Sequence, residues 1–275
     1  MSKIALTVFQ ARAGDRNNLA IPGAKSIGSA LERQLGVTST VIGSPEPALN
    51  ANWTVELEAA MPALRAMADR YESIMQEGLC ALCASSRCAV SLATLPAVAK
   101  HRPDCCVVWF DAHADLNTPD TTTTGYLGGL ALSGPAGMWS SGLGGGLSLA
   151  NIILVGQRDI DPPEQALIDD GRVLHLPPSV DLPMALRRAI AGRPVYVHLD
   201  CDVLNPGIVP TDYVHENGLS LENLRAAFSA IADGEVVGLE IAEFQNAWTN
   251  DGEPVSPDAL LDAMLPVVDR IGCLA

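Results

Sequence analysis

Residues 111–115, with the sequence Asp-Ala-His-Ala-Asp, combine side chains that could bind a metal ion. They follow an apolar run at residues 105–110 that is typical of a buried strand. Alternate side chains of a strand point to the same side, so Asp111, His113 and Asp115 are predicted to share one face. Carboxylate and imidazole ligands at a strand end suit a divalent cation such as manganese, zinc or iron.

A second acidic pair follows another strand-like run, at residues 194–199. Asp200 and Asp202 come directly after this run, and the same alternation places both of them on one face. Parallel α/β sheets place their functional residues beyond the carboxyl ends of strands. A solvated turn rich in Asp and Asn would explain either segment alone, but it does not predict two such pairs. We therefore interpret the two segments as one cation site.

The composition indicates a protein with a large core and no affinity for nucleic acid. Of the 275 residues, 48% are apolar and only 18% are charged, and the net charge is −15. Such a charge argues against a nucleic-acid partner. The apolar stretches are too short to span a membrane, so no membrane partner is expected. Seven cysteines without a signal-peptide pattern predict reduced thiols and a cytoplasmic location.

Strand-like and helical patterns alternate along the chain, and no linker or internal repeat divides it. Strands are predicted at residues 4–9, 40–42, 79–84, 105–110, 151–155, 172–176, 194–199 and 236–241. Helices are predicted at residues 24–35, 53–77 with an interruption at Pro62, 90–100, 163–170, 184–191, 221–232 and from Ser256 onward. We expect one domain, residues 1–275, with a parallel sheet covered by helices on both faces. Periodicity alone leaves an open sheet and a closed barrel as alternatives.

The two acidic motifs together carry a resemblance to a known family. Asp-Ala-His-Ala-Asp and Asp-Cys-Asp-Val-Leu-Asn-Pro resemble the paired metal motifs of the arginase/agmatinase (ureohydrolase) family. The resemblance implies a three-layer α/β/α fold with an open, mostly parallel eight-stranded sheet. It also implies a binuclear manganese centre that hydrolyses guanidino groups. Asp111 and Asp200 would bridge two metals. His113 and Asp202 would complete one site, and Asp115 would serve the other.

The resemblance also implies residues that hold the substrate. Asn117 and Thr124 fall on the positions by which arginases bind the α-carboxylate of their substrate. Asp161 and Glu164 fall on positions that address its α-amino group, and Glu243 on the carboxylate that binds the guanidinium. The implied partner is a small guanidino substrate with an amino-acid head. The family usually forms homo-oligomers, and the sequence leaves the oligomeric state open.

Two departures from the family pattern affect the metal site. Its Gly-Gly-Asp-His-Ser motif reads Ser-Ser-Arg-Cys-Ala here, which puts Cys88 in place of a metal-binding His. A thiolate can ligate manganese, although it suits zinc or iron better. The alternative is a small buried residue beside a weak or empty second site, so one or two Mn²⁺ ions per chain are expected. The place of the proton-shuttling His is taken by Gly128.

These features predict a metal-dependent amidinohydrolase that cleaves L-arginine or Nω-hydroxy-L-arginine to urea or hydroxyurea plus ornithine. Asp115 would orient the attacking water and carry its proton to the leaving amine, and Glu243 would pair with the guanidinium. A Cys at this position of the first motif resembles the motif of family members that hydrolyse N-hydroxyarginine. The alternative is a non-catalytic family member with a degenerate metal site, acting as a binding or regulatory protein. Cys88 and Gly128 favour this alternative, whereas the complete set of Asp ligands argues against it.

Overall fold

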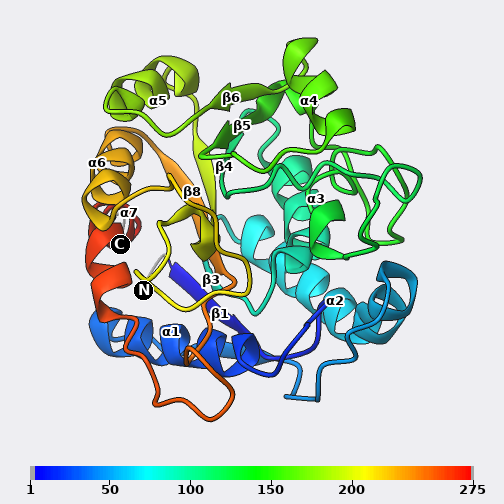
Figure 1. The fold of residues 1–275 in the computed structure, drawn as a ribbon. Helices are drawn as coiled ribbons and strands as arrows, with labels where there is room; N and C mark the ends of the chain where they lie inside the picture. Colours follow the sequence, from blue (N-terminus) through cyan, green and yellow to red (C-terminus); the bar gives the residue numbers. More distant parts are fainter. Residues whose placement is uncertain (1–3, 274–275) are drawn as a thin grey trace.

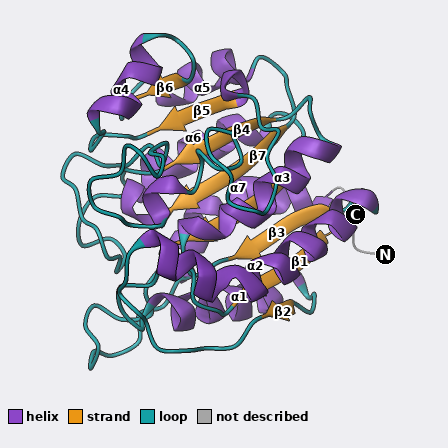
Figure 2. Ribbon diagram, turned by 90° about the vertical axis from the view of Figure 1, so that its right-hand side faces the viewer, coloured by secondary structure: helices purple, strands orange, loops and turns teal. Residues whose placement is uncertain are grey.

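One open sheet of eight parallel strands runs through the molecule, and the computed structural model describes residues 4–273 of the chain (Figure 1). The strand order is β2-β1-β3-β8-β7-β4-β5-β6, and Figure 2 shows the strands pointing the same way. The strands are β1 (Ile4–Phe9), β2 (Thr40–Ile42), β3 (Cys80–Ala84), β4 (Cys106–Phe110), β5 (Ile152–Val155), β6 (Leu174–Leu176), β7 (Val195–Asp200) and β8 (Val236–Ala242). The predicted parallel sheet is confirmed, and the open form is the correct alternative.

Helices cover both faces of the sheet and complete the three predicted layers. The helices are α1 (Ala20–Leu35), α2 (Trp53–Gln76), α3 (Ser91–His101), α4 (Pro162–Asp169), α5 (Leu182–Ile190), α6 (Leu221–Ala232) and α7 (Asp258–Cys273). One apolar core lies between the sheet and α1, α5, α6 and α7, and a second lies under α2, α3 and α4. The central strands are buried on both sides, which explains their continuous apolar sequences. No helix within residues 4–273 is long and apolar enough to cross a membrane.

Helix α2 differs from the prediction because it continues through Pro62. Proline removes one helical hydrogen bond and usually bends or ends a helix. Here Pro62 is exposed, so the unpaired carbonyl group one turn earlier is placed on the solvent side. Leu57, Leu64 and Met67 bury the opposite face of the helix against the sheet. This burial outweighs the local defect.

The strand order brings together four loops that carry the predicted chemistry. Strands β3, β8, β7 and β4 are consecutive neighbours, although they are far apart in sequence. Cys88 follows β3, Glu243 follows β8, Asp200 ends β7 and Asp111 follows β4. Since parallel strands end at the same edge, these four side chains meet there.

Helix α1 packs unusually close to the segment that follows β8. A Cβ atom added at Gly23 would lie 1.8 Å from the carbonyl oxygen of Phe244, directly after Glu243. We predict that Gly23→Ala lowers the free energy of unfolding by about 1–3 kcal/mol, because the backbones must move apart. Gly234→Ala is the control, since its added carbon would meet only an ordinary contact at 3.8 Å and should change stability by less than about 0.5 kcal/mol. Urea unfolding of both variants checks this, and equal stability would refute the close approach.

Candidate metal and substrate site

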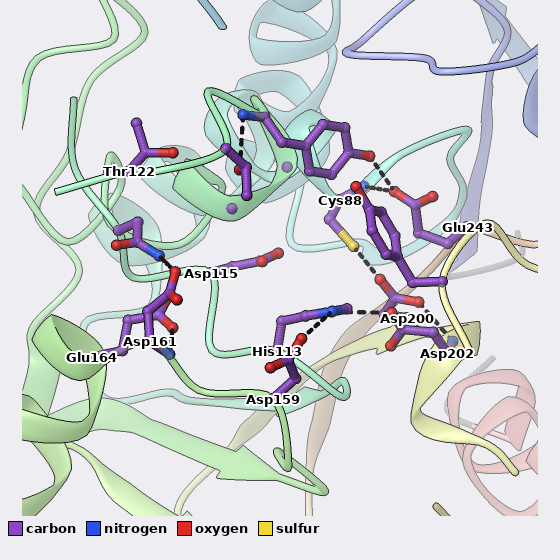
Figure 3. Close-up of a pocket in the computed structure, with 16 residues that line it drawn as sticks. Cys88, His113, Asp115, Thr122, Asp159, Asp161, Glu164, Asp200, Asp202 and Glu243 are labelled. Atoms are coloured by element: carbon purple, nitrogen blue, oxygen red, sulfur yellow. Dashed lines mark hydrogen bonds and ion pairs between the residues drawn. The ribbon is translucent and has the colours of Figure 1, made fainter. Parts of the chain in front are cut away.

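A pocket of about 140 Å³ opens at the carboxyl edge of the sheet (Figure 3). Every predicted site residue except Asp111 lines it. The lining residues are Cys88, His113, Asp115, Asn117, Thr122, Thr124, Tyr126, Gly128, Gly129, Asp159, Asp161, Glu164, Asp200, Asp202, Tyr213 and Glu243. Asp111 is fully buried beside this pocket.

One imidazole and two carboxylates form the first group of potential ligands. His113 Nδ1 lies 3.1 Å from Asp111 Oδ1 and 3.0 Å from Asp202 Oδ2. The other oxygens are held in place, because Trp109 Nε1 donates to Asp111 Oδ2 at 3.0 Å and the Ala112 amide donates to Asp202 Oδ1 at 2.9 Å. One ligand atom from each of the three residues lies within 4.8 Å of the others. The group is therefore compact enough to surround one cation.

The predicted alternation along a strand is wrong, although the side chains do converge. Strand β4 ends at Phe110, and Asp115 has a left-handed backbone with φ of 52°. Asp202 lies in a short 3₁₀ turn after β7, where its amide donates to Asp200 Oδ1 at 2.7 Å. Asp side chains readily form such local hydrogen bonds with the backbone and turn the chain. Turns of this kind, rather than strand periodicity, direct the carboxylates into the pocket.

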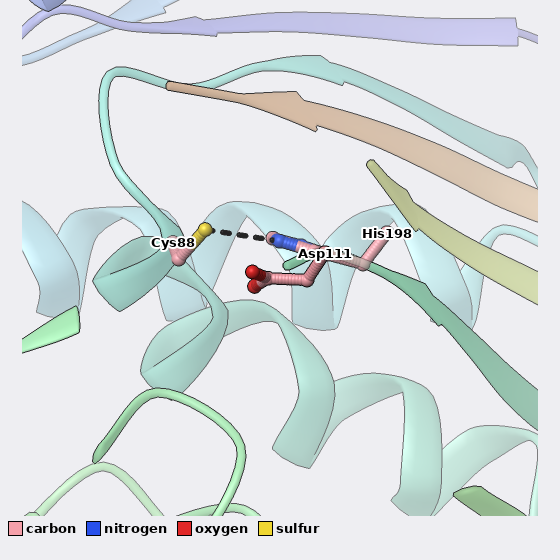
Figure 4. Close-up of side chains that lie close together, drawn as sticks. All are labelled: Cys88, Asp111 and His198. Carbon is pink, nitrogen blue, oxygen red and sulfur yellow. Dashed lines mark hydrogen bonds between the residues drawn. The ribbon is translucent and has the colours of Figure 1, made fainter. Parts of the chain in front are cut away.

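Cys88 lies in the second group of potential ligands. Its buried thiol donates to Asp200 Oδ2 at 2.9 Å (Figure 3) and lies 3.2 Å from His198 Nε2 (Figure 4). Cys88, Asp111 and His198 can place one ligand atom each within 4.8 Å, and so can Cys88, Asp200 and Glu243. Burial and the neighbouring Asp200 raise the pKa of the thiol well above its usual value. Cys88 is thus a protonated thiol unless a cation displaces the proton.

His198 is a buried polar residue that the sequence analysis treated only as part of a strand. Its Nδ1 lies 2.7 Å from Glu240 Oε1, and its ring stacks on Trp109 with 3.5 Å between ring centres. The sheet register places Trp109, His198 and Glu240 side by side on three neighbouring strands. Thr94 and Tyr196 also donate to Glu240. Polar residues within apolar strands, at His198 and Glu240, are the sequence signal for this row.

The orientation of His198 is that of many metal-binding imidazoles. Such a ring usually binds a carboxylate through one nitrogen and presents the other to the metal. Glu240 holds Nδ1, and Nε2 faces Cys88. Burial opposes ionisation of Glu240, but the hydrogen bond from His198 holds the pKa of Glu240 below its usual value. His198 could therefore act as a ligand that the sequence analysis missed.

The acidic side chains repel one another strongly in this buried place. Burial and the neighbouring Asp202 raise the pKa of Asp111 to about 7. Burial and other carboxylates also raise the pKa values of Asp115 and Asp200 well above their usual range. Burial opposes a charge on His113, yet hydrogen bonds to Asp111 and Asp202 raise its pKa. A divalent cation fits this set, because it would replace the missing positive charge and the donors are oxygen, nitrogen and sulfur.

The residues predicted to bind the amino-acid head lie across Asp115 from Cys88 and Asp200 (Figure 3). Asn117 Nδ2 donates to Asp161 Oδ2 at 2.7 Å. Glu164 accepts from the Leu116 amide at 2.9 Å and from the Asp161 amide at 3.0 Å. Glu164 therefore also fixes the loop that carries Asp115. Thr124 lies at the more exposed rim, where its hydroxyl accepts from the Tyr126 amide.

Gly128, at the predicted position of the shuttle His, is covered by an aromatic ring. A Cβ atom at Gly128 would lie 2.4 Å from Tyr126 Cε1, so the ring occupies the space of any side chain there. Another imidazole lies beside His113, on a different segment of the chain. His215 Nε2 lies 3.1 Å from His113 Nε2, and its loop was not singled out from the sequence.

Comparisons with known proteins agree with the fold and the motifs. The Arginase family model matches residues 29–255. The N(omega)-hydroxy-L-arginine amidinohydrolase of Streptomyces lavendulae is 40% identical over 267 residues, which cover 97% of each chain. The arginase of Bacillus subtilis superposes with a TM-score of 0.82 at 18% identity, over 96% of this chain and 98% of that one. The Entamoeba histolytica arginase in complex with L-ornithine gives 0.81 at 21% identity, over 96% and 97%. The two structural likenesses show the same fold.

The buried row of Trp109, His198 and Glu240 leads to a prediction about stability. Glu240→Ala should lower the free energy of unfolding by about 3–5 kcal/mol, because it leaves His198 and its neighbours buried without their partner. Glu72→Ala is the matched control, since Glu72 pairs with Lys100 and His101 near the surface and should matter far less. Guanidinium unfolding of both variants gives the comparison. Equal losses would show that the buried row contributes no special stability.

Proposed function

Because the chain belongs to the arginase family, we propose that it hydrolyses the guanidino group of an arginine-type amino acid with the help of a divalent metal. The substrate is Nω-hydroxy-L-arginine or L-arginine, and the products are hydroxyurea or urea together with ornithine. The observation that carries this proposal is the meeting of His113, Asp200 and Asp202 in one pocket, with Asp111 buried beside it and grouped with His113 and Asp202. The similarity to the Streptomyces amidinohydrolase over nearly the full chain favours the hydroxylated substrate.

A catalytic role is favoured over a purely binding or regulatory one. A degenerate site would have no reason to keep six buried acidic side chains, since burying like charges is unfavourable without function or compensation; they are Asp111, Asp115, Glu164, Asp200, Asp202 and Glu243. Two of them, Asp115 and Glu243, have left-handed backbones with φ of 52° and 65°. Strained backbone of this kind accumulates at functional sites. Buried like charges and strained backbone are both typical of an active site, and the pocket has both.

Manganese is the proposed cofactor, with one or two ions per chain. Asp111, His113 and Asp202 would hold one ion, with Asp111 and Asp200 shared between two positions. Cys88 and Asp115 would complete the second position, where the orientation of His198 adds a possible nitrogen ligand. A bound divalent cation supplies the Lewis acidity that activates water at neutral pH.

The residues of the chain would bind, orient and move protons around this centre. Asp115 points into the pocket (Figure 3), where its carboxylate would take a proton from water and give it to the leaving amine. Glu243 would orient the guanidino group. Asn117, Thr124 and Asp161 would hold the amino-acid head, and their place beyond Asp115 sets the length of the substrate.

We predict that the manganese-loaded protein prefers substrates with an intact amino-acid head. Agmatine lacks the α-carboxylate, so it leaves Asn117 and Thr124 without their charged partner. A lost hydrogen bond to a charged group corresponds to about 1.5–3 kcal/mol, or roughly 10- to 150-fold in kcat/KM. The assay measures urea and hydroxyurea released from L-arginine, Nω-hydroxy-L-arginine and agmatine.

The Asp115→Asn variant is the inactive control for this assay, because it keeps the shape of the side chain and removes the carboxylate that would transfer protons and serve the second metal position. It should bind substrate but lose most of the turnover. Equal turnover of agmatine would contradict the assignment of the amino-acid pocket. Release from none of the three compounds would contradict the proposed function itself.

A further inference from the structure

A guanidinium group of the chain itself stands beside the carboxylate expected to bind the guanidino group of the substrate. Arg87 directly precedes Cys88 and is completely buried. Its Nη1 donates to Glu243 Oε2 at 2.7 Å. Its Nε donates to Asp15 Oδ1 at 3.0 Å, and Nη1 also pairs with Asp212. Asp15 and Asp212 therefore hold the guanidinium in place against Glu243.

Glu243 already has partners on both of its oxygens. Oε2 accepts from Arg87, while Oε1 accepts from the Cys88 amide at 3.0 Å and from the Tyr126 hydroxyl at 3.5 Å. Glu243 still lines the pocket, so a ligand can reach it (Figure 3). The carboxylate that this ligand meets is already paired with Arg87, so it is not a free anion.

We propose that Arg87 is a specificity-determining residue that makes this pocket prefer an uncharged guanidino group over a guanidinium. The inference rests on the proposed function and names the form of the substrate that the site selects. Hydroxylation lowers the basicity of a guanidino group, so the neutral form of an N-hydroxyguanidine is far more available than that of arginine. The substrate of this site is then the neutral N-hydroxyguanidine.

The magnitude follows from the distance between like charges. Two guanidinium groups that share one carboxylate lie about 4–6 Å apart, and at an effective dielectric constant of about 20 their repulsion corresponds to roughly 100- to 1,000-fold in affinity, of which Asp15 and Asp212 offset a part. A neutral guanidino group avoids this repulsion. It also brings a nitrogen lone pair that can accept a hydrogen bond, whereas a guanidinium only donates.

The test compares three variants of the manganese-loaded protein. Arg87→Met removes the charge at similar volume, Arg87→Lys keeps the charge, and Arg12→Met removes a guanidinium that pairs with Glu46 outside this cluster. The quantity is the ratio of kcat/KM for Nω-hydroxy-L-arginine to that for L-arginine. Arg87→Met should lower this ratio about 100-fold, whereas the other two should leave it within about threefold. An unchanged ratio in Arg87→Met, with hydroxyurea still released, would overturn the inference alone.

A measurement on the wild-type protein covers the case in which Arg87→Met fails to fold. L-citrulline has the amino-acid head and length of L-arginine but carries an uncharged ureido group. Titration calorimetry should give a dissociation constant for L-citrulline at least about tenfold lower than for L-arginine. Tighter binding of L-arginine would overturn the inference. This comparison needs no turnover, so it separates a failure of the charge preference from a failure of the proposed hydrolysis.

Discussion

The main physical constraint on this structure is the crowding of buried carboxylates at one edge of the sheet. Asp111, Asp115, Asp200, Asp202 and Glu243 are each at most 5% exposed, and the loops after β4, β7 and β8 bring them together. Like charges in a poorly solvated place raise one another's pKa values and oppose folding. Within residues 4–273, the basic side chains that form ion pairs with these carboxylates are His113 and Arg87. A divalent cation would supply the remaining positive charge, and the groups of potential ligands lie where it could bind.

The two ends of the pocket balance charge in different ways. Around His113 and Asp202 the ligands are open to a cation, with the buried row of Trp109, His198 and Glu240 packed beneath them. At Glu243 the chain provides its own guanidinium, Arg87. The first end suits a metal that activates water, and the second suits a guanidino group with little charge. Together they describe a hydrolase for a weakly basic substrate, which agrees with the proposed N-hydroxyarginine.

The sequence was sufficient to predict the parallel sheet, its helices and most residues that line the pocket. Periodicity alone could not separate an open sheet from a barrel, because closure depends on the strand order; the open form was predicted from the family resemblance and is confirmed. Strand alternation correctly grouped Asp111, His113 and Asp115, but the backbone conformation it assumed is wrong. Asp115 has a left-handed backbone, which the sequence pattern of a strand does not reveal. Arg87 and His198 were missed because each looks unremarkable alone. The roles we assign to them depend on partners more than 100 residues away in sequence, Glu243 for Arg87 and Cys88 for His198.

The central claim is that the buried carboxylate cluster is a cation site. Titration calorimetry of chelator-treated protein with Mn²⁺, for the wild type beside Asp200→Asn, tests it most directly. Asn keeps the size of the side chain and removes one shared negative charge, so the two proteins differ mainly in their attraction for the ion. We predict that the wild type binds at least one Mn²⁺ per chain and that Asp200→Asn binds it at least about tenfold more weakly. A wild type that binds no Mn²⁺, or a variant that binds it equally well, would contradict the account.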